Sequence, residues 1–181
     1  SQSSNSFYLV TTAQKSAYFT KDPYSTMIIL QREICNPITQ DFSRRNKSMQ
    51  EVIQFLQENP VQYLATVGRD GRAKCRPFMF SGELDGKLWF CTNHTKEVYQ
   101  DMQRNPYIEI TTSSPEYAWL RLSGEATFEK NMAAKEMCMR NPIVKGQYGG
   151  ADNPIFEVFY LKNAHAVLAD FSGNPPKEYT L

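Results

Sequence analysis

The chain has 181 residues, 41% hydrophobic and 22% charged, which is typical of one globular domain with an appendage. Its 20 basic and 19 acidic residues give a net charge of +1. This balance argues against a duplex-DNA binder, which neutralises phosphates with a clustered basic face. The longest aliphatic run, residues 27–30, is far shorter than the roughly twenty residues of a transmembrane helix. We therefore expect neither nucleic acid nor membrane as a partner.

The four cysteines are widely spaced and include no Cys-x-x-Cys pair. They are Cys35, Cys75, Cys91 and Cys138. This spacing fits neither a zinc site nor a small disulfide scaffold. We expect reduced thiols, no bound metal and a cytoplasmic location.

Residues 1–48 differ in composition from the rest of the chain, with scattered Ser, Thr and Asn. We interpret them as an N-terminal extension whose order the sequence leaves open. Ser48 and Glu51 have the spacing of a capping box, which predicts that an amphipathic helix begins at residue 48 and ends before Pro60.

From residue 63 onward the pattern becomes β. Two Asp-Gly pairs, at residues 70–71 and 85–86, supply the positive φ values of tight hairpins. Gly124, inside a later strand, marks a bend or bulge. The expected strands cover residues 63–67, 73–80, 81–84, 87–91, 107–112, 117–129, 155–161 and 164–169.

Two predicted helices, over residues 95–104 and 131–140, lie between these strands, and residues 141–153 form a Gly- and Pro-rich loop. Short helices inserted into antiparallel strands favour a mainly β fold, a small antiparallel barrel of about six strands, over a doubly wound sheet. We place this domain at residues 49–170 and interpret residues 171–181 as a C-terminal tail that runs over the surface.

The strongest candidate binding site is the polar strand-to-helix junction with the sequence Cys-Thr-Asn-His-Thr-Lys, residues 91–96. Unpaired N–H groups, the helix dipole, Thr hydroxyls and Lys96 together favour an anion such as phosphate. The alternative is that Asn93 or Thr95 only caps the helix. Arg76, on a strand expected to pair beside the strand that leads into this junction, would reach the same phosphate.

No side chain is a clear catalytic candidate. The only histidines are His94 and His165, and the Gly-x-Ser-x-Gly and His-Glu-x-x-His motifs are absent, which argues against hydrolysis by those routes. We interpret His165, on a predicted strand, as a structural or surface residue. The role of His94 stays open because this residue lies in the polar junction.

Several motifs occur in a defined order along this domain. They are Tyr-Leu-Ala-Thr-Val, an Asp-Gly hairpin, Arg-Pro-Phe-Met-Phe at 76–80, Leu-Trp-Phe-Cys-Thr-Asn at 88–93, Lys96, and Asn-Pro at 105–106. Together they resemble the pyridoxamine 5'-phosphate oxidase-like FMN-binding split-barrel family, over about residues 49–170. The resemblance implies a six-stranded antiparallel split β-barrel and a homodimer with FMN at the subunit interface.

The same resemblance assigns residues to the flavin. The implied phosphate ligands are Arg76, Thr92, Asn93, Thr95 and Lys96. The residues implied to line the isoalloxazine ring are Phe78, Met79 and Phe80. Cations suit a phosphate dianion and apolar strand residues suit a flat ring. Trp119 has two interpretations, a flavin contact or an aromatic residue of the dimer interface.

The chain departs from the true pyridoxamine phosphate oxidases at three places. Ser81 replaces a Lys, Trp119 replaces a Gln, and residues 171–181 lack the Arg- and Trp-rich C-terminal segment. Oxidation of pyridoxamine phosphate is therefore not expected. The chain looks closer to the shorter single-domain branch of the family, which includes flavin reductase-like and nitroimidazole-resistance-like proteins.

Three further features have two interpretations each. In one interpretation His94 lies near the flavin, which only its position in the sequence suggests. In the other it caps the helix or faces water. Tyr148 and the Gly149-Gly150 pair belong to a lid over the site or to a plain mobile loop. Cys75 and Cys91 are redox partners of the flavin or buried, inert thiols.

These observations predict an FMN-dependent oxidoreductase that moves electrons from NADH or NADPH to a small acceptor such as a quinone, a nitro compound or a flavin. No catalytic side chain is required, because the cofactor carries the redox chemistry. The alternative is a non-catalytic protein that binds or senses a flavin or haem. A small-barrel binder of single-stranded nucleic acid is disfavoured by the near-neutral charge.

Overall fold

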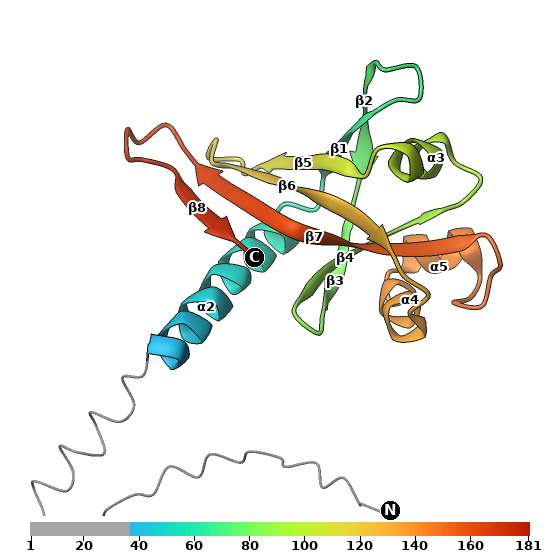
Figure 1. The fold of residues 1–181 in the computed structure, drawn as a ribbon, viewed down its shortest axis with the longest axis horizontal. Helices are drawn as coiled ribbons and strands as arrows, with labels where there is room; N and C mark the ends of the chain where they lie inside the picture. Colours follow the sequence, from blue (N-terminus) through green and yellow to red (C-terminus); the bar gives the residue numbers. More distant parts are fainter. Residues whose placement is uncertain (1–36) are drawn as a thin grey trace, which may run out of the picture. The chain divides into compact units, whose positions relative to one another are not determined.

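Both Asp-Gly pairs turn the chain back as predicted, with φ values of 76° at Gly71 and 71° at Gly86 that glycine adopts without steric cost. The computed structural model describes the backbone of residues 37–181 and the side chains of residues 44–181 (Figure 1). Its helices are α2 (Pro37–Glu58), α3 (Glu97–Arg104), α4 (Met132–Cys138) and α5 (Pro142–Tyr148). Its strands are β1 (Gln62–Val67), β2 (Ala73–Phe78), β3 (Phe80–Leu84), β4 (Lys87–Asn93), β5 (Tyr107–Ser113), β6 (Trp119–Phe128), β7 (Phe156–Ala169) and β8 (Lys177–Thr180).

Residues 41–181 form one compact unit, built on a single antiparallel sheet. The strand order is β2-β1-β5-β6-β7-β4-β3, and β8 pairs with β7. The mainly β, antiparallel fold with short helices is confirmed, with eight strands in place of the predicted six. The two predicted strands at residues 155–161 and 164–169 are one continuous strand, β7. The bulge predicted at Gly124 is confirmed, because the register between β6 and β7 shifts between Ser123 and Glu125.

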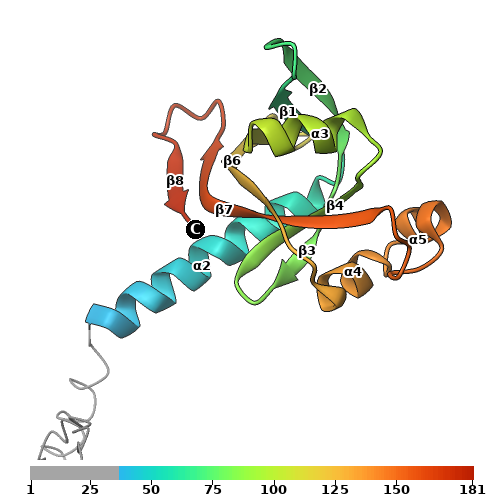
Figure 2. The same ribbon diagram turned by 45° about the vertical axis from the view of Figure 1, so that its right-hand side comes forward.

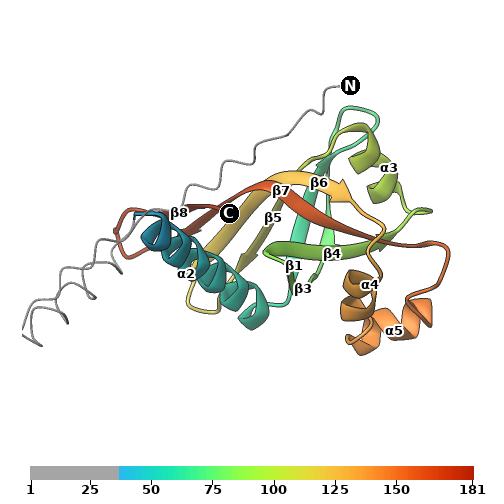
Figure 3. The ribbon, with the colours of Figure 1, turned by 60° about the horizontal axis from the view of Figure 1, so that its bottom comes forward.

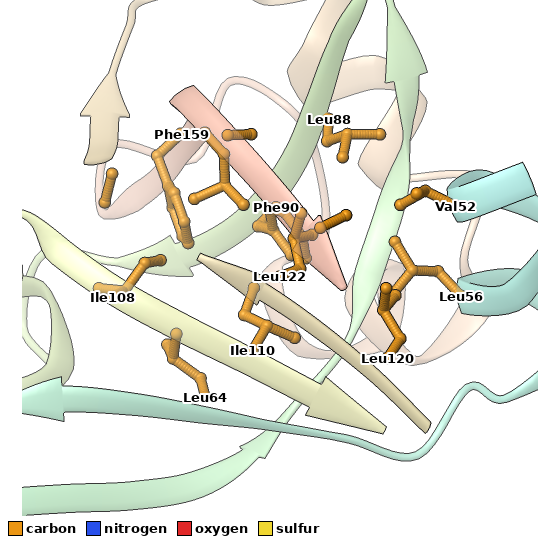
Figure 4. Packing of buried hydrophobic residues seen from close by; sticks show 14 of the residues in the cluster. Val52, Leu56, Leu64, Leu88, Phe90, Ile108, Ile110, Leu120, Leu122 and Phe159 are labelled. Atoms are coloured by element: carbon orange, nitrogen blue, oxygen red, sulfur yellow. The ribbon is translucent and has the colours of Figure 1, made fainter. Parts of the chain in front are cut away.

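The main apolar core fills the concave side of the curved sheet (Figure 4). Alternating strand residues point into it, as the period of two in β1 and β5 predicts. Its largest fully buried side chains include Phe90, Phe159, Leu64, Ile110 and Leu122. Helix α2 closes one side of this core with Val52 and Leu56, which lie beside Leu120 and Leu88 in the close view.

Helix α2 begins at Pro37, eleven residues before the predicted capping box. Ser48 therefore lies inside the helix, where its hydroxyl donates to the carbonyl of Arg44 at 3.0 Å. A Ser side chain bonded to the preceding turn is a common mid-helix arrangement, so the prediction that Ser48 starts the helix is wrong. The rest of the predicted extension, residues 1–36 with Cys35, lies outside the described residues.

Helices α4 and α5 form a second layer on the outer side of β4 (Figure 2). Because β4 is covered on both faces, three consecutive residues, Leu88, Trp89 and Phe90, are all buried. Helix α4 is the predicted helix with Asn131 as its N-cap, which accepts from the N–H of Ala134 at 3.0 Å. Helix α5 replaces part of the loop predicted at 141–153.

The C-terminal segment ends in strand β8, which pairs with β7 from His165 to Leu168. Residues 171–178 and 180 are exposed, which agrees with the predicted surface tail, but the strand at residues 177–180 was not predicted. Figure 3 shows β8 beside α2 at the end of the sheet opposite α4 and α5. Within the described residues, no helix combines the length and hydropathy needed to span a membrane.

Candidate functional site

A cavity of about 690 Å³ lies between the segment that joins β2 to β3 and the helices α4 and α5. We call it the α4–α5 cavity. Residues 77–83 line one side, Cys91 comes from β4, and Lys96 comes from the junction before α3. The lining residues of the helix pair are Met137, Arg140, Asn141, Ile143, Val144, Gln147 and Tyr148. A volume of this size accommodates a cofactor or another small molecule.

The three residues predicted to line the isoalloxazine ring all line this cavity. The rings of Phe78 and Phe80 pack against Phe90, with ring centroids 6.3 and 5.6 Å apart. The Met79 sulfur accepts from the amide of Asn141 at 3.2 Å, which ties the segment to the start of α5. The structure thus fixes this wall from both sides, while contact with a flavin stays a prediction.

Helix α4 packs on β3, and the Met137 side chain of α4 lies over Gly82. A Cβ atom at Gly82 would lie 2.7 Å from the sulfur of Met137, and its φ of +149° is one that L side chains rarely adopt. Ser81, the position where the true oxidases have a Lys, also lines the cavity. Glu83 lines it too, but its carboxylate accepts from the N–H of Gly86 at 2.6 Å.

Two basic residues line the cavity, Lys96 and Arg140. Lys96 is the N-cap residue of α3, and its side chain makes no capping hydrogen bond. Among the side chains of residues 44–181, no carboxylate forms an ion pair with either cation. Arg140 is not among the site residues predicted from the sequence. Its signal was weak, because an Arg at the end of a predicted helix is ordinarily a solvated residue.

Arg76 does not line the cavity. The prediction that its strand pairs beside β4 is wrong, because the Asp70-Gly71 turn folds β2 back onto β1. The Arg76 guanidinium donates to the hydroxyl of Thr66 at 2.7 Å and lies 3.7 Å from the carboxylate of Asp101 on α3. Asp101 is nearly fully buried, so Arg76 balances a buried charge. Its implied phosphate contact stays a prediction.

The polar junction is organised by Asn93 at the end of β4. Its side-chain oxygen accepts from the backbone N–H and the hydroxyl of Thr95 at 3.0 and 2.7 Å, and its NH₂ donates to the hydroxyl of Tyr148 at 3.2 Å. The helix cap itself is Lys96. Thr92 is 1% exposed, and its hydroxyl has no hydrogen-bond partner among the described residues. None of Thr92, Asn93 and Thr95 lines the cavity, so their phosphate contacts stay predictions.

His94 and Trp119 also lie outside the α4–α5 cavity. His94 is 42% exposed, with Nδ1 3.7 Å from the carboxylate of Glu157. Trp119 starts β6 and packs against Phe171 with ring centroids 5.2 Å apart. In a single chain, neither side chain lines the cavity in which a cofactor would bind. A flavin contact of either residue stays a prediction.

The loop predicted around Tyr148 is ordered as a helix. Asn141 accepts from the N–H of Ile143 at 2.9 Å, Pro142 occupies the first turn, and Tyr148 is 7% exposed. Tyr148 packs on Phe156 with ring centroids 4.7 Å apart. Residues 142–148 therefore form a helical wall of the cavity, and the loop predicted at 141–153 is wrong over this range. The role of the segment as a lid stays a prediction.

Cys91 and Cys138 interact beneath this wall. Hydrogen bonds from the Cys138 thiol and the Ser81 hydroxyl, together with the charge of Lys96, hold the pKa of Cys91 below its usual value of 9.0 against the opposing effect of burial. The bond to Cys91 and burial both raise the pKa of Cys138. Cys75 is exposed on β2 and does not line the cavity.

Comparison with known proteins assigns the family. The model of the pyridoxamine 5'-phosphate oxidase family matches residues 48–167, which is more than half of the chain. The chain belongs to the pyridoxamine 5'-phosphate oxidase family.

The similarity to individual relatives is more distant. The chain is 36% identical over 64 residues to the pyridoxine/pyridoxamine 5'-phosphate oxidase of Chromobacterium violaceum, a match that covers 35% of this chain and 30% of that enzyme. A NimC/NimA family protein from Clostridium acetobutylicum aligns with a TM-score of 0.69 and 28% identity, over 76% of this chain and 94% of that one. A haem-binding protein from Mycobacterium smegmatis shares the fold, with a TM-score of 0.57 and 19% identity over 68% of this chain and 54% of that one.

Proposed function

We propose that this protein is an FMN-dependent oxidoreductase that binds its flavin in the α4–α5 cavity. The observation that carries the proposal is the pair of cations, Lys96 and Arg140, that face one cavity without a carboxylate partner among the described side chains. Two unpaired cations at a cavity favour an anionic ligand, because charge-assisted hydrogen bonds to phosphate are among the strongest polar contacts in proteins.

The residues present fit an FMN group. Lys96 and Arg140 would hold the phosphate, and the segment 78–80 with Val144 would lie against the apolar ring. The buried Thr92 hydroxyl that lacks a partner among the described residues belongs to the 91–96 junction but does not line this cavity, so it takes no part in this assignment. A lining that contains both cations and apolar side chains suits a nucleotide-like ligand with a flat aromatic part.

When bound, FMN supplies the redox chemistry, taking a hydride from NADH or NADPH and passing electrons to a small acceptor such as a quinone, a nitro compound or a flavin. The chain's own residues bind and orient it. Phe78 and Phe80 are anchored in the core through Phe90, so the wall behind the ring is rigid. Helices α4 and α5 supply the wall of the cavity opposite this segment.

A homodimer with the flavin at the subunit interface, as the resemblance implies, is part of the same proposal. The outer faces of β1 and the neighbouring β5 expose Tyr63, Val67 and Tyr107, at 44, 42 and 66%. Clustered exposed apolar side chains on adjacent strands are typical of an interaction surface. Sedimentation velocity with and without FMN tests this part, and a monomer in both conditions contradicts it.

The first experiment is the visible spectrum of the purified chain, with mass spectrometry of any ligand released on denaturation, before and after addition of FMN. A flavin spectrum with released FMN supports the proposal. A colourless protein that takes up no FMN contradicts it, and a haem spectrum replaces it with the haem-binding alternative.

A second experiment separates an enzyme from a flavin carrier. Anaerobic addition of NADH or NADPH to the FMN-loaded protein is expected to bleach the flavin spectrum, and a quinone or nitro compound is expected to restore it. Bound FMN that neither nucleotide reduces above the rate for free FMN contradicts the oxidoreductase and favours a non-catalytic flavin binder.

A further inference from the structure

Tyr148, the last residue of α5, brings a hydroxyl group to the wall of the α4–α5 cavity. The residue is 7% exposed, and its ring packs on Phe156 with ring centroids 4.7 Å apart. The backbone carbonyl of Tyr148 accepts from the side-chain amide of Asn153 at 2.8 Å. Because both the ring and the backbone are held by contacts within the chain, the fold itself sets the position of the hydroxyl.

The hydrogen bond between Asn93 and Tyr148 determines where the proton of this hydroxyl points. Asn93 is 6% exposed, and its side-chain oxygen accepts from the backbone N–H and the hydroxyl of Thr95 at 3.0 and 2.7 Å. Because a backbone N–H can only donate, this contact fixes which end of the amide is the oxygen. The amide nitrogen therefore faces the Tyr148 hydroxyl, at 3.2 Å. Since that nitrogen donates, the Tyr148 oxygen is the acceptor, and its own proton is directed elsewhere.

The proton of the Tyr148 hydroxyl has no acceptor among the side chains and backbone of residues 44–181. A buried hydroxyl that accepts one hydrogen bond and donates none keeps an unused donor, and an unused buried donor is unfavourable. The cavity lies beside this side chain. An acceptor that binds in the cavity would complete the hydrogen bonding of Tyr148.

The junction before α3 indicates the charge of that acceptor. The backbone carbonyl of Asn93 accepts from the N–H of Lys96 at 3.3 Å, so the residue that bonds to Tyr148 and the residue that carries the ammonium group are joined within one turn. Lys96 and Tyr148 both line the cavity. A cation and an O–H donor beside the same junction suit an oxygen of an anionic group such as phosphate, because hydrogen bonds to charged acceptors are the stronger ones.

We propose that Tyr148 is a binding residue for the anionic group of the ligand, to which its hydroxyl donates a hydrogen bond beside Lys96. This assignment rests on the proposed function, because it names a further contact of the proposed flavin site. It gives α5 a role in ligand recognition in addition to its place in the cavity wall. The hydroxyl thereby favours a phosphate ester over the same ligand without its phosphate.

The test compares Tyr148→Phe with the unchanged chain by fluorescence titration with FMN and with riboflavin, which lacks the phosphate. The variant keeps the aromatic ring on Phe156 and removes only the hydroxyl. The Kd for FMN is expected to rise about tenfold, and the Kd for riboflavin is expected to stay nearly unchanged. An equal rise for both flavins would show a purely structural role of the hydroxyl and overturns the proposal, as does an unchanged Kd for FMN.

Tyr160→Phe is the matched control. Tyr160 packs on Trp89 in the same apolar cluster but does not line the cavity, so both Kd values are expected to stay unchanged. An unchanged chain that binds neither flavin contradicts the proposed function and this assignment together. Weaker FMN binding in Lys96→Ala without any loss in Tyr148→Phe contradicts this assignment alone.

The Tyr148→Phe variant also leaves the Asn93 amide without its acceptor, so thermal unfolding without flavin is measured before each titration. Should this variant not fold, a fluorinated tyrosine incorporated at position 148 keeps the hydroxyl and reports on its surroundings by fluorine NMR. Its resonance is expected to shift more on saturation with FMN than with riboflavin. Equal shifts for the two flavins overturn the proposal.

Discussion

The side-chain oxygen of Gln62 accepts from the backbone N–H of Phe80 at 2.7 Å. The amide nitrogen of the same side chain donates to the carbonyls of Leu56 and Asn59 at 2.9 and 3.3 Å. Gln62 is 1% exposed. One buried amide thus joins the end of α2, the start of β1 and the start of β3, which belongs to the cavity wall.

Replacing Gln62 with Leu is expected to destabilise the protein. The substitution puts an apolar side chain of similar size in the place of the amide and leaves the N–H of Phe80 and the carbonyl of Leu56 without partners. A buried polar group left unpaired costs about 1–3 kcal/mol, so the free energy of unfolding is expected to fall by at least this amount. Urea denaturation measures the change.

The matched control for this variant is Gln54→Leu. Gln54 is exposed on α2 and bonds only to Glu58 within the helix, at 2.8 Å, so its loss is expected to leave the urea midpoint nearly unchanged. Equal midpoints for the two variants would show that the Gln62 bonds contribute no net stability.

Arg76→Ala tests whether this cation serves the fold or a phosphate. The side chain bonds to Thr66 and lies beside the buried Asp101, so we expect the free energy of unfolding to fall by about 1–3 kcal/mol. Riboflavin lacks the phosphate of FMN. We expect the affinities of the variant for FMN and for riboflavin to fall by the same factor or to stay unchanged. Arg72→Ala, in the same hairpin but exposed, is the control for both titrations. A selective loss of FMN affinity would instead support the phosphate contact that the resemblance implies.

The sequence predicted the strands well where local signals are strong. Asp-Gly turns and alternating apolar residues gave both hairpins, and Asn131 gave the start of α4, because these signals depend on neighbouring residues only. Strand β8 was missed because it is held by pairing with residues 165–168 and by the contact of Lys177 with Glu51, which is far away in the sequence. No local pattern encodes such a contact.

The sequence predicted only some residues of the candidate site, because the others reach it through contacts between distant segments. The segment 78–80 and Lys96 line one cavity, while their contacts with a flavin stay predictions. Arg140 was missed because α4 reaches the cavity by packing on β3, a contact between segments about fifty residues apart in the sequence. The strand that carries Arg76 was predicted to pair with β4, but it pairs with β1 at the end of the strand order. The sequence of a strand does not specify which strand lies beside it.

Lys96→Ala is expected to weaken FMN binding. Loss of one charge-assisted contact to phosphate costs about 1.5–3 kcal/mol, so the Kd for FMN is expected to rise by roughly ten- to a hundredfold. Fluorescence titration measures the Kd. Arg140→Ala is expected to have a similar effect, because it faces the same cavity.

Riboflavin and a distant lysine provide the controls. The affinity for riboflavin is expected to change little in Lys96→Ala, and Lys130→Ala, an exposed lysine outside the cavity, is expected to leave both affinities unchanged. FMN binding that is unaffected in both Lys96→Ala and Arg140→Ala would rule out the phosphate site.

The contact between α2 and β8 is expected to depend on pH. The carboxylate of Glu51 accepts from Lys177 at 2.5 Å and from the hydroxyl of Tyr179 at 2.6 Å, and these bonds lower the pKa of Glu51 from its usual 4.5. Stability from this group is therefore present above pH 4.5 and is lost as the pH falls through the lowered value. Burial and the bond to Glu51 raise the pKa of Tyr179 from 10.0 to about 12, so its contribution is lost as the pH rises from 10 toward 12.

Hydrogen exchange of the β8 amides, normalised to the intrinsic exchange rate at each pH, measures this dependence. We expect maximal protection between about pH 5 and 10 and a decline on either side. Glu51→Gln keeps an acceptor for Tyr179 but removes the ion pair with Lys177, so protection at neutral pH is expected to fall and its acid-dependent decline to become smaller. Glu58→Gln, on the same helix and bonded only to Gln54, is expected to preserve the profile. An acid decline of equal size in Glu51→Gln would assign the titration to another carboxylate.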